Sequence, residues 1–215
     1  MSPGTREPSR TRVYLLRHGE SANPRVFHGS ESDIDLSDRG RLQAARIATL
    51  FPALRPSAVV SSAMLRARET AAPIAAACGL PLRIERALHE RSIGPMSGSP
   101  HEEFEGDWQM TRRSWQAGET SFAPPGTESF DQIRARVLPV WNGLAHEYQG
   151  HSIVIVAHGV VCKVLLVSVV NGWTVADWSK PGPIQNVAIS ELVQAGKGWE
   201  PVRINELPTV IRDLG

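Results

Sequence analysis

Two stretches that lie far apart in the sequence each end an apolar run with a histidine followed by a glycine. The runs Val13–Leu16 and Ile153–Ala157 lead into Arg17-His18-Gly19 and His158-Gly159. Continuous apolar runs of this kind are typical of buried parallel strands. Ligands bind at the carboxyl ends of such strands in open α/β sheets. We therefore expect the two histidines to meet at one edge of a sheet, where each glycine lets the backbone turn tightly.

Two further charged side chains could join the histidines. Arg66 falls in the first turn of a predicted helix after the run Ala58–Ser62, where a cation opposes the helix dipole and needs another partner. Glu90 lies in a glycine-rich loop. With Arg17, these residues provide two guanidinium groups and two imidazoles, and arginine binds a phosphate dianion bidentately. The helix that begins at Gly159 would add its amino terminus to this predicted phosphate site.

Each of these residues also has a purely structural interpretation. Arg-His-Gly can end a strand and enter a turn, Arg66 can be an exposed surface arginine, and a carboxylate in a loop can be simply solvated. Other motifs fit known chemistry less well. Gly150-His151-Ser152 precedes its strand, whereas the serine of a hydrolase elbow follows one. We find no P-loop, dinucleotide fingerprint or zincin helix, and we interpret His28, His89 and His146 as surface or loop residues.

Predicted strands and helices alternate along the chain, which favours an α/β fold: a three-layer sandwich with a mostly parallel central sheet flanked by helices. The helix after Ser37 is expected to bury Leu42, Ala45, Ile47 and Leu50. A single catalytic domain is predicted over residues 13–205, with a helical insertion at about 99–124 that caps the strand ends. Residues 1–12 are predicted to be a disordered tail, and residues 206–215 an irregular C-terminal tail.

Composition narrows the possible partners. The chain has 215 residues and a formal net charge of +1, which gives no global field for nucleic acid or an anionic membrane. No apolar run is long enough for a membrane span. Cys78 and Cys162 lie in apolar contexts without metal-ligand spacing, so we expect reduced, buried thiols in a cytoplasmic protein and no metal site.

Taken together, the motifs resemble those of the histidine phosphatase superfamily, the phosphoglycerate mutase-like proteins. They follow the order found in that family and span nearly the whole chain except the tails. The matching segments are Leu16 to Glu20, Leu36 to Gly40 with Gln43-Ala44, Ser61 to Ala67, Leu88 to Arg91 with Gly94 and Gly98, Pro125 to Ser129, and Ala157 to Gly159.

This resemblance implies a metal-independent enzyme that hydrolyses a small phosphomonoester through a phosphohistidine and needs no cofactor. It implies that His18 is the nucleophile and that Arg17, Arg66 and His158 bind the phosphate. Glu90 would protonate the leaving group and then activate water. The two neighbouring arginines would keep the His18 imidazole neutral. Asn23 and Gly159 are expected as further phosphate contacts.

The chain also departs from the family pattern. The loop between His18 and Gly29 is shorter than in many members, so the family's asparagine falls at Asn23 only with a shifted spacing. Pro95-Met96-Ser97 replaces the usual bulky aromatic and acidic residues, which suggests altered substrate contacts. A phosphoglycerate mutase and a non-catalytic binding module that kept the fold remain alternatives to the phosphatase, and a homodimer remains open.

Overall fold

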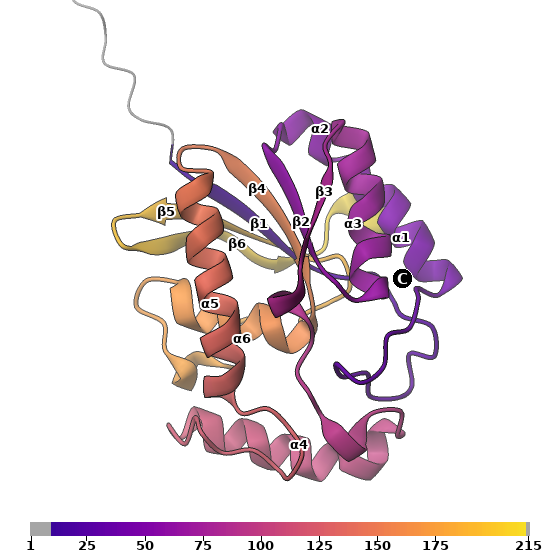
Figure 1. The fold of residues 1–215 in the computed structure, drawn as a ribbon, viewed down its shortest axis with the longest axis vertical. Coiled ribbons are helices and arrows are strands. Elements are labelled where there is room, and N and C mark those ends of the chain that lie inside the picture. Colours follow the sequence, from indigo (N-terminus) through magenta and orange to yellow (C-terminus); the bar gives the residue numbers. More distant parts are fainter. Residues whose placement is uncertain (1–9, 214–215) are drawn as a thin grey trace, which may run out of the picture.

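Six strands form one twisted sheet in the computed structural model, which describes residues 10–213 (Figure 1). The strand order is β3-β2-β4-β1-β5-β6. The bounds are β1 (Arg12–Arg17), β2 (Ala58–Ser62), β3 (Leu82–Glu85), β4 (Ser152–Ala157), β5 (Ile189–Ala195) and β6 (Gly198–Glu206). Strands β1 to β4 are parallel, whereas β5 and β6 are antiparallel to their neighbours. The predicted mostly parallel α/β sheet is therefore confirmed.

Helices cover both faces of the sheet because alternate residues of each central strand point to opposite sides. Val13 and Leu15 pack toward α5 (Phe130–Glu147) and α6 (Gly159–Val169). Tyr14 and Leu16 pack toward the other layer. That layer contains α1 (Asp38–Ala48), α2 (Phe51–Leu54), α3 (Leu65–Cys78) and α7 (Thr209–Arg212). The two apolar layers hold the carboxyl ends of β1 and β4 side by side, with Arg17 opposite Ala157 in the strand register.

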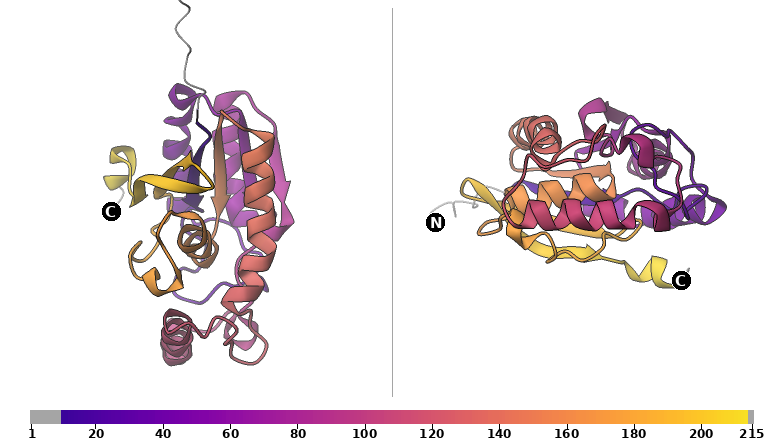
Figure 2. Two further views of the ribbon diagram at one scale, coloured as in Figure 1. Left: turned by 90° about the vertical axis from the view of Figure 1, so that its left-hand side faces the viewer. Right: turned by 90° about the horizontal axis from the view of Figure 1, so that it is seen from below.

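Helix α4 (His101–Gln116) lies across the carboxyl ends of the parallel strands, as two perpendicular views show (Figures 1 and 2). It falls within the segment expected to be a helical insertion. Trp115 anchors it: this ring is fully buried, lies 5.3 Å from the Trp178 ring, and donates a hydrogen bond from Nε1 to the carbonyl oxygen of Phe122. Three short 3₁₀ turns complete the fold, η1 (Arg86–Leu88), η2 (Gly94–Met96) and η3 (Val175–Asp177).

The buried face of α1 differs from the expected one. Leu42 and Ala45 are exposed, and the helix instead buries a neighbouring stripe that includes Gln43, Ala44 and Ile47. On this side the Gln43 side-chain oxygen accepts a hydrogen bond from the Glu20 backbone N–H, beside the buried apolar residues Ile47 and Ala48. Of the four residues expected on the buried face, Ile47 is buried and Leu50 packs against the core, whereas Leu42 and Ala45 are exposed.

Both predicted tails include residues that belong to the ordered fold. Residues 1–9 lie outside the described part of the chain, but Thr11 is buried and its carbonyl oxygen accepts a hydrogen bond from the Gln194 N–H. At the other end, residues expected to be irregular form α7, whose Ile211 is buried in the layer with α1. Cys162 is buried as expected, Cys78 is only half-buried, and both are free thiols. No helix among residues 10–213 is long and apolar enough to cross a membrane.

Candidate active site at the carboxyl edge of the sheet

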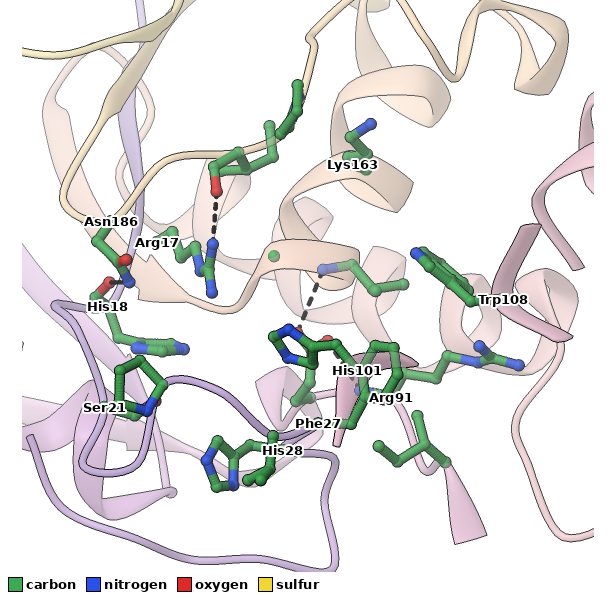
Figure 3. A pocket seen from close by; sticks show the side chains of 18 of the residues that line it. Arg17, His18, Ser21, Phe27, His28, Arg91, His101, Trp108, Lys163 and Asn186 are labelled. Carbon is green, nitrogen blue, oxygen red and sulfur yellow. Dashed lines mark hydrogen bonds between the residues drawn. The ribbon is translucent and has the colours of Figure 1, made fainter. Parts of the chain in front are cut away.

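A cavity of about 560 Å³ opens at the carboxyl ends of β1 and β4 (Figure 3). Its walls come from β1 and the following loop, the loop around Glu90, α4, the first turns of α6, and the segment before β5. Arg17, His18, Glu90 and Gly159 line the cavity. Four residues singled out from the sequence therefore meet where two parallel strands end. A volume of this size is typical of a site for a small organic ligand.

His18 is buried and held in one tautomer. Its Nδ1 lies 2.6 Å from the Gly19 carbonyl oxygen, which can only accept a hydrogen bond, so Nδ1 carries the proton and Nε2 keeps its lone pair. Burial, followed by the charges of Arg17 and Arg66, holds the pKa of His18 well below its usual range. The imidazole is therefore neutral, and Nε2 is a competent nucleophile.

Two contacts of Gly19 fix the loop after His18. Gly19 passes so near Gly40, at the start of α1, that a Cβ on Gly19 would lie 2.8 Å from the Gly40 carbonyl oxygen. The Gly19 N–H also donates to Thr70 Oγ1 at 2.9 Å. Only glycine fits such a contact. The motif that contains His18 and Gly19 is therefore in direct contact with the motif at Leu36–Gly40.

His158 lies beside His18 but behind the cavity wall. The two ring centroids are 5.1 Å apart, and His158 is completely buried. Its Nε2 lies 2.9 Å from Ser62 Oγ at the end of β2, whereas its Nδ1 has no hydrogen-bond partner among residues 10–213. Burial, followed by Arg66 and His18, lowers the pKa of His158 well below its usual range. A neutral second imidazole therefore stands next to the nucleophile.

Arg66 is buried rather than exposed on the surface. Its guanidinium donates to the carbonyl oxygens of Ser32 at 2.8 Å and Gly29 at 3.3 Å. Arg66 thereby holds the loop over His18 and supplies positive charge, but it does not line the cavity. The sequence placed it correctly near His18, whereas its main partners are backbone carbonyls that no sequence motif indicates.

Arg17 faces the cavity directly. Its Nη1 donates to the Ile184 carbonyl oxygen at 2.7 Å, and its Nε has no hydrogen-bond partner among the residues described. Burial lowers the Arg17 pKa, and the nearby Glu90 partly opposes this effect. A Cβ on Gly159 would lie 3.7 Å from Arg17 Nε. The absence of a side chain at Gly159 leaves room around a cation that can still bind an anion.

Glu90 is oriented by two backbone N–H groups. Its Oε1 accepts from the Arg91 N–H at 2.8 Å, and its Oε2 accepts from the Val160 N–H in the first turn of α6 at 3.2 Å. This helix terminus was expected to bind phosphate, but the Val160 N–H is engaged by the carboxylate instead. Glu90 lines the same cavity as His18. It is therefore placed to exchange a proton with a ligand there.

Asn23 is not placed as expected. It is exposed, its φ is 55°, and it is not among the residues that line the cavity. Its carbonyl oxygen lies 2.8 Å from His28 Nε2. His28 itself, interpreted from the sequence as a surface or loop residue, lines the cavity (Figure 3). The sequence already contained a sign that Asn23 would not bind phosphate, because it matches the family's asparagine only with a shifted spacing.

Several lining residues were missed by the sequence interpretation. Asn186 donates from Nδ2 to the His18 carbonyl oxygen at 2.9 Å. It precedes β5, and because β5 is antiparallel to β1, its beginning lies at the carboxyl end of β1. Other missed residues are Arg91, His101, Trp108, Arg112, Lys163 and Ile184. Among residues 10–213, no group of three His, Cys, Asp or Glu side chains could hold a metal ion.

Comparison with known proteins identifies the family. The pattern of the histidine phosphatase superfamily, branch 1, matches residues 13–207. The chain belongs to this superfamily. A glucosyl-3-phosphoglycerate phosphatase of Mycobacterium tuberculosis (strain ATCC 25618 / H37Rv) is 29% identical over 206 residues, 89% of this chain and 91% of that protein. A metal-independent phosphoserine phosphatase of Arabidopsis thaliana is 30% identical over 195 residues, 88% of this chain and 79% of that protein.

Solved structures agree with the sequence match. The native structure of a mycobacterial glucosyl-3-phosphoglycerate phosphatase superposes with a TM-score of 0.80 at 27% identity, covering 92% of this chain and 100% of that one. The resemblance inferred from the motifs is thus confirmed, together with the histidine phosphatase fold. The cavity with His18 and Glu90 is the candidate active site of this family member.

Proposed function

We propose that this histidine phosphatase hydrolyses a small phosphomonoester through a phosphohistidine at His18. The observation that carries the proposal is the state of this side chain: Nδ1 is tied to the Gly19 carbonyl oxygen, and the buried imidazole is neutral. Membership of the superfamily and the phosphatases among its relatives confirm the predicted phosphatase activity. The roles of individual residues are part of the proposal.

In the first step, His18 Nε2 attacks phosphorus while the bond between phosphorus and the ester oxygen breaks. The departing oxygen takes a proton from the Glu90 carboxyl group, so that the product leaves as the alcohol and not as an alkoxide. Arg17, whose Nε has no partner among residues 10–213 and lies beside the cavity, stabilises the charge on the phosphoryl oxygens. The charge of the buried Arg66 supports the same stabilisation.

In the second step, water attacks the phosphohistidine and Glu90 accepts the proton of that water. The bond between nitrogen and phosphorus breaks, inorganic phosphate is released, and His18 returns to its neutral form. The arginines supply the positive charge that metal ions supply in other phosphatases. We also propose a cytoplasmic location, because the free Cys78 and Cys162 are typical of a reducing compartment.

The decisive experiment is to label the protein with a radioactive phosphomonoester in the presence of EDTA. The wild-type protein should form an acid-labile phosphoenzyme and release phosphate, whereas His18→Ala should do neither. His158→Ala should keep a slow residual turnover, because it removes a neighbour and leaves the nucleophile. Covalent label on the His18→Ala protein would show that another residue takes the phosphoryl group.

The same preparations can separate hydrolysis from mutase chemistry. Phosphorylated metabolites are assayed with and without 2,3-bisphosphoglycerate. Release of phosphate that does not depend on this compound supports the phosphatase. Isomerisation that requires it would favour the mutase, and no turnover with any substrate would favour a non-catalytic binding module.

A further inference from the structure

The cavity extends well beyond the reacting group. At about 560 Å³ it has room for a substrate that continues past its phosphate. His18 and Arg17 lie at one side, and Trp108 and Lys163 lie at the other (Figure 3). The cavity wall is partly apolar, because Phe27, Met96, Val160 and Ile184 also line it. The side of the cavity at Trp108 and Lys163 therefore contacts the end of the substrate opposite its phosphate.

Lys163 is positioned at this far side by helix geometry. It follows Gly159 by four residues on α6, so both lie on the same face of the helix. Four residues correspond to a rise of about 6 Å along the axis. Gly159 adjoins Arg17 at the phosphate end. The backbone of Lys163 thus lies roughly one helical turn farther along α6 than Gly159 does.

Of the two cations at this far side, Arg112 has a carboxylate partner and Lys163 has none among residues 10–213. The Lys163 ammonium donates to the Trp178 carbonyl oxygen at 3.2 Å and lies 5.3 Å from the centre of the Trp178 ring. Burial, followed by the charge of Arg112, lowers the Lys163 pKa to about 8. The Arg112 guanidinium lies over the Trp108 ring at 5.5 Å and forms an ion pair with Glu105, with 3.7 Å between Nη2 and Oε1.

Two partly buried cations that repel one another favour an anionic ligand. We propose that Lys163 and Arg112 form a second anion subsite, which binds a carboxylate at the end of the substrate opposite its phosphate. The substrate class is therefore phosphomonoesters whose phosphate and carboxylate are separated by an apolar or flat middle part. This inference rests on the proposed function for the phosphate end of the cavity.

The test measures binding without turnover. A series of alkyl phosphonates of graded length, ending in either a carboxylate or a hydroxyl group, is titrated into the protein by calorimetry. The wild type should bind the best carboxylate about tenfold more tightly than its hydroxyl counterpart, which corresponds to roughly 1.4 kcal/mol. Lys163→Met should remove most of this preference, Arg112→Leu should reduce it, and Lys163→Arg should retain it.

A matched control is Lys180→Met, since Lys180 is exposed, pairs with Asp177 and lies outside the cavity lining. It should keep the wild-type preference. No preference in the wild type at any length, or an unchanged preference in Lys163→Met, would overturn the subsite. Phenyl phosphate hydrolysis by the same preparations tests the proposed function separately, because the phosphonate titrations do not depend on catalysis.

Discussion

Glu90 has the most demanding role of any single residue in the site, because it must donate a proton and then accept one. Glu90→Gln keeps the size of the side chain and removes this capacity. General acid catalysis contributes about 10² to 10⁴ in rate, and an alkoxide needs it more than an aryl oxide does. Hydrolysis of alkyl phosphates should therefore fall by such a factor, while phosphorylation by aryl phosphates falls much less.

Pre-steady-state kinetics with an aryl phosphate checks this prediction for Glu90. A burst of aryl alcohol should precede slow turnover in Glu90→Gln, because water is no longer activated for the second step. Equal losses with both kinds of substrate and no burst would show that Glu90 only holds the loop, through its bonds to the Arg91 and Val160 N–H groups.

His18 and His158 also make stability depend on pH. Burial and neighbouring positive charge lower both pKa values well below the usual range, whereas an unfolded histidine titrates near about 6.5. As the pH falls below that value, the unfolded chain binds protons that the folded protein does not. The free energy of unfolding should therefore decrease, by up to about 1.4 kcal/mol per pH unit for each histidine.

His158→Gln should remove one of these two contributions. Urea unfolding at a series of pH values below about 6.5 should then show a slope smaller by up to about 1.4 kcal/mol per pH unit than that of the wild type. An identical slope in both proteins would mean that His158 is already protonated in the folded state.

At the scale of elements, α5 holds the loop that carries Glu90. The Arg136 guanidinium donates to the carbonyl oxygens of Ala87 at 2.6 Å, His89 at 2.8 Å and Glu90 at 3.2 Å. It also binds both carboxylate oxygens of Glu128, which precedes the helix. A planar guanidinium can make all of these bonds at once, whereas an ammonium cannot. Arg136 is thus a positioning residue for the proposed acid.

Arg136→Lys should lower kcat for alkyl phosphates by about 10- to 100-fold, because small displacements of a reacting group cost that much. Aryl phosphates, which depend less on an acid, should lose less. Arg134→Lys is the matched control on the same helix, since Arg134 is exposed, and it should resemble the wild type. A uniform loss for both substrate classes would indicate general damage to the fold.

At the scale of the whole molecule, the cavity exists because α4 is fastened across the sheet edge. Trp115 provides this anchor, with its ring 5.3 Å from the Trp178 ring and 5.9 Å from the Phe130 ring. Trp115→Ala should lower the free energy of unfolding by about 3–5 kcal/mol. It should also raise KM, because α4 contributes Trp108 to the cavity wall.

Urea denaturation and steady-state kinetics test the anchor together. Met110→Ala changes an exposed residue of the same helix, and it should alter stability by no more than about 0.5 kcal/mol. If Trp115→Ala were as stable as Met110→Ala, the aromatic cluster would not be what holds α4 in place.

Local patterns along the chain are enough to specify the α/β class and the centre of the site. Apolar runs specify buried strands, and a histidine and glycine directly after such a run must lie at the strand end. These patterns alone place Arg17, His18 and His158 at one edge of the sheet. The alternation of strands and helices likewise specifies the α/β class, because parallel strands require crossover helices.

The other groups that reach this edge are brought there by tertiary packing. Asn186 is there because β5 runs antiparallel to β1, and Lys163 faces the same cavity as Arg112 because α4 crosses the ends of the strands. Likewise, the buried side of α1 includes Gln43, which accepts a hydrogen bond from the Glu20 N–H. Strand direction, the docking of an inserted helix and a buried polar contact depend on packing between distant segments, which residue spacing along the chain does not encode.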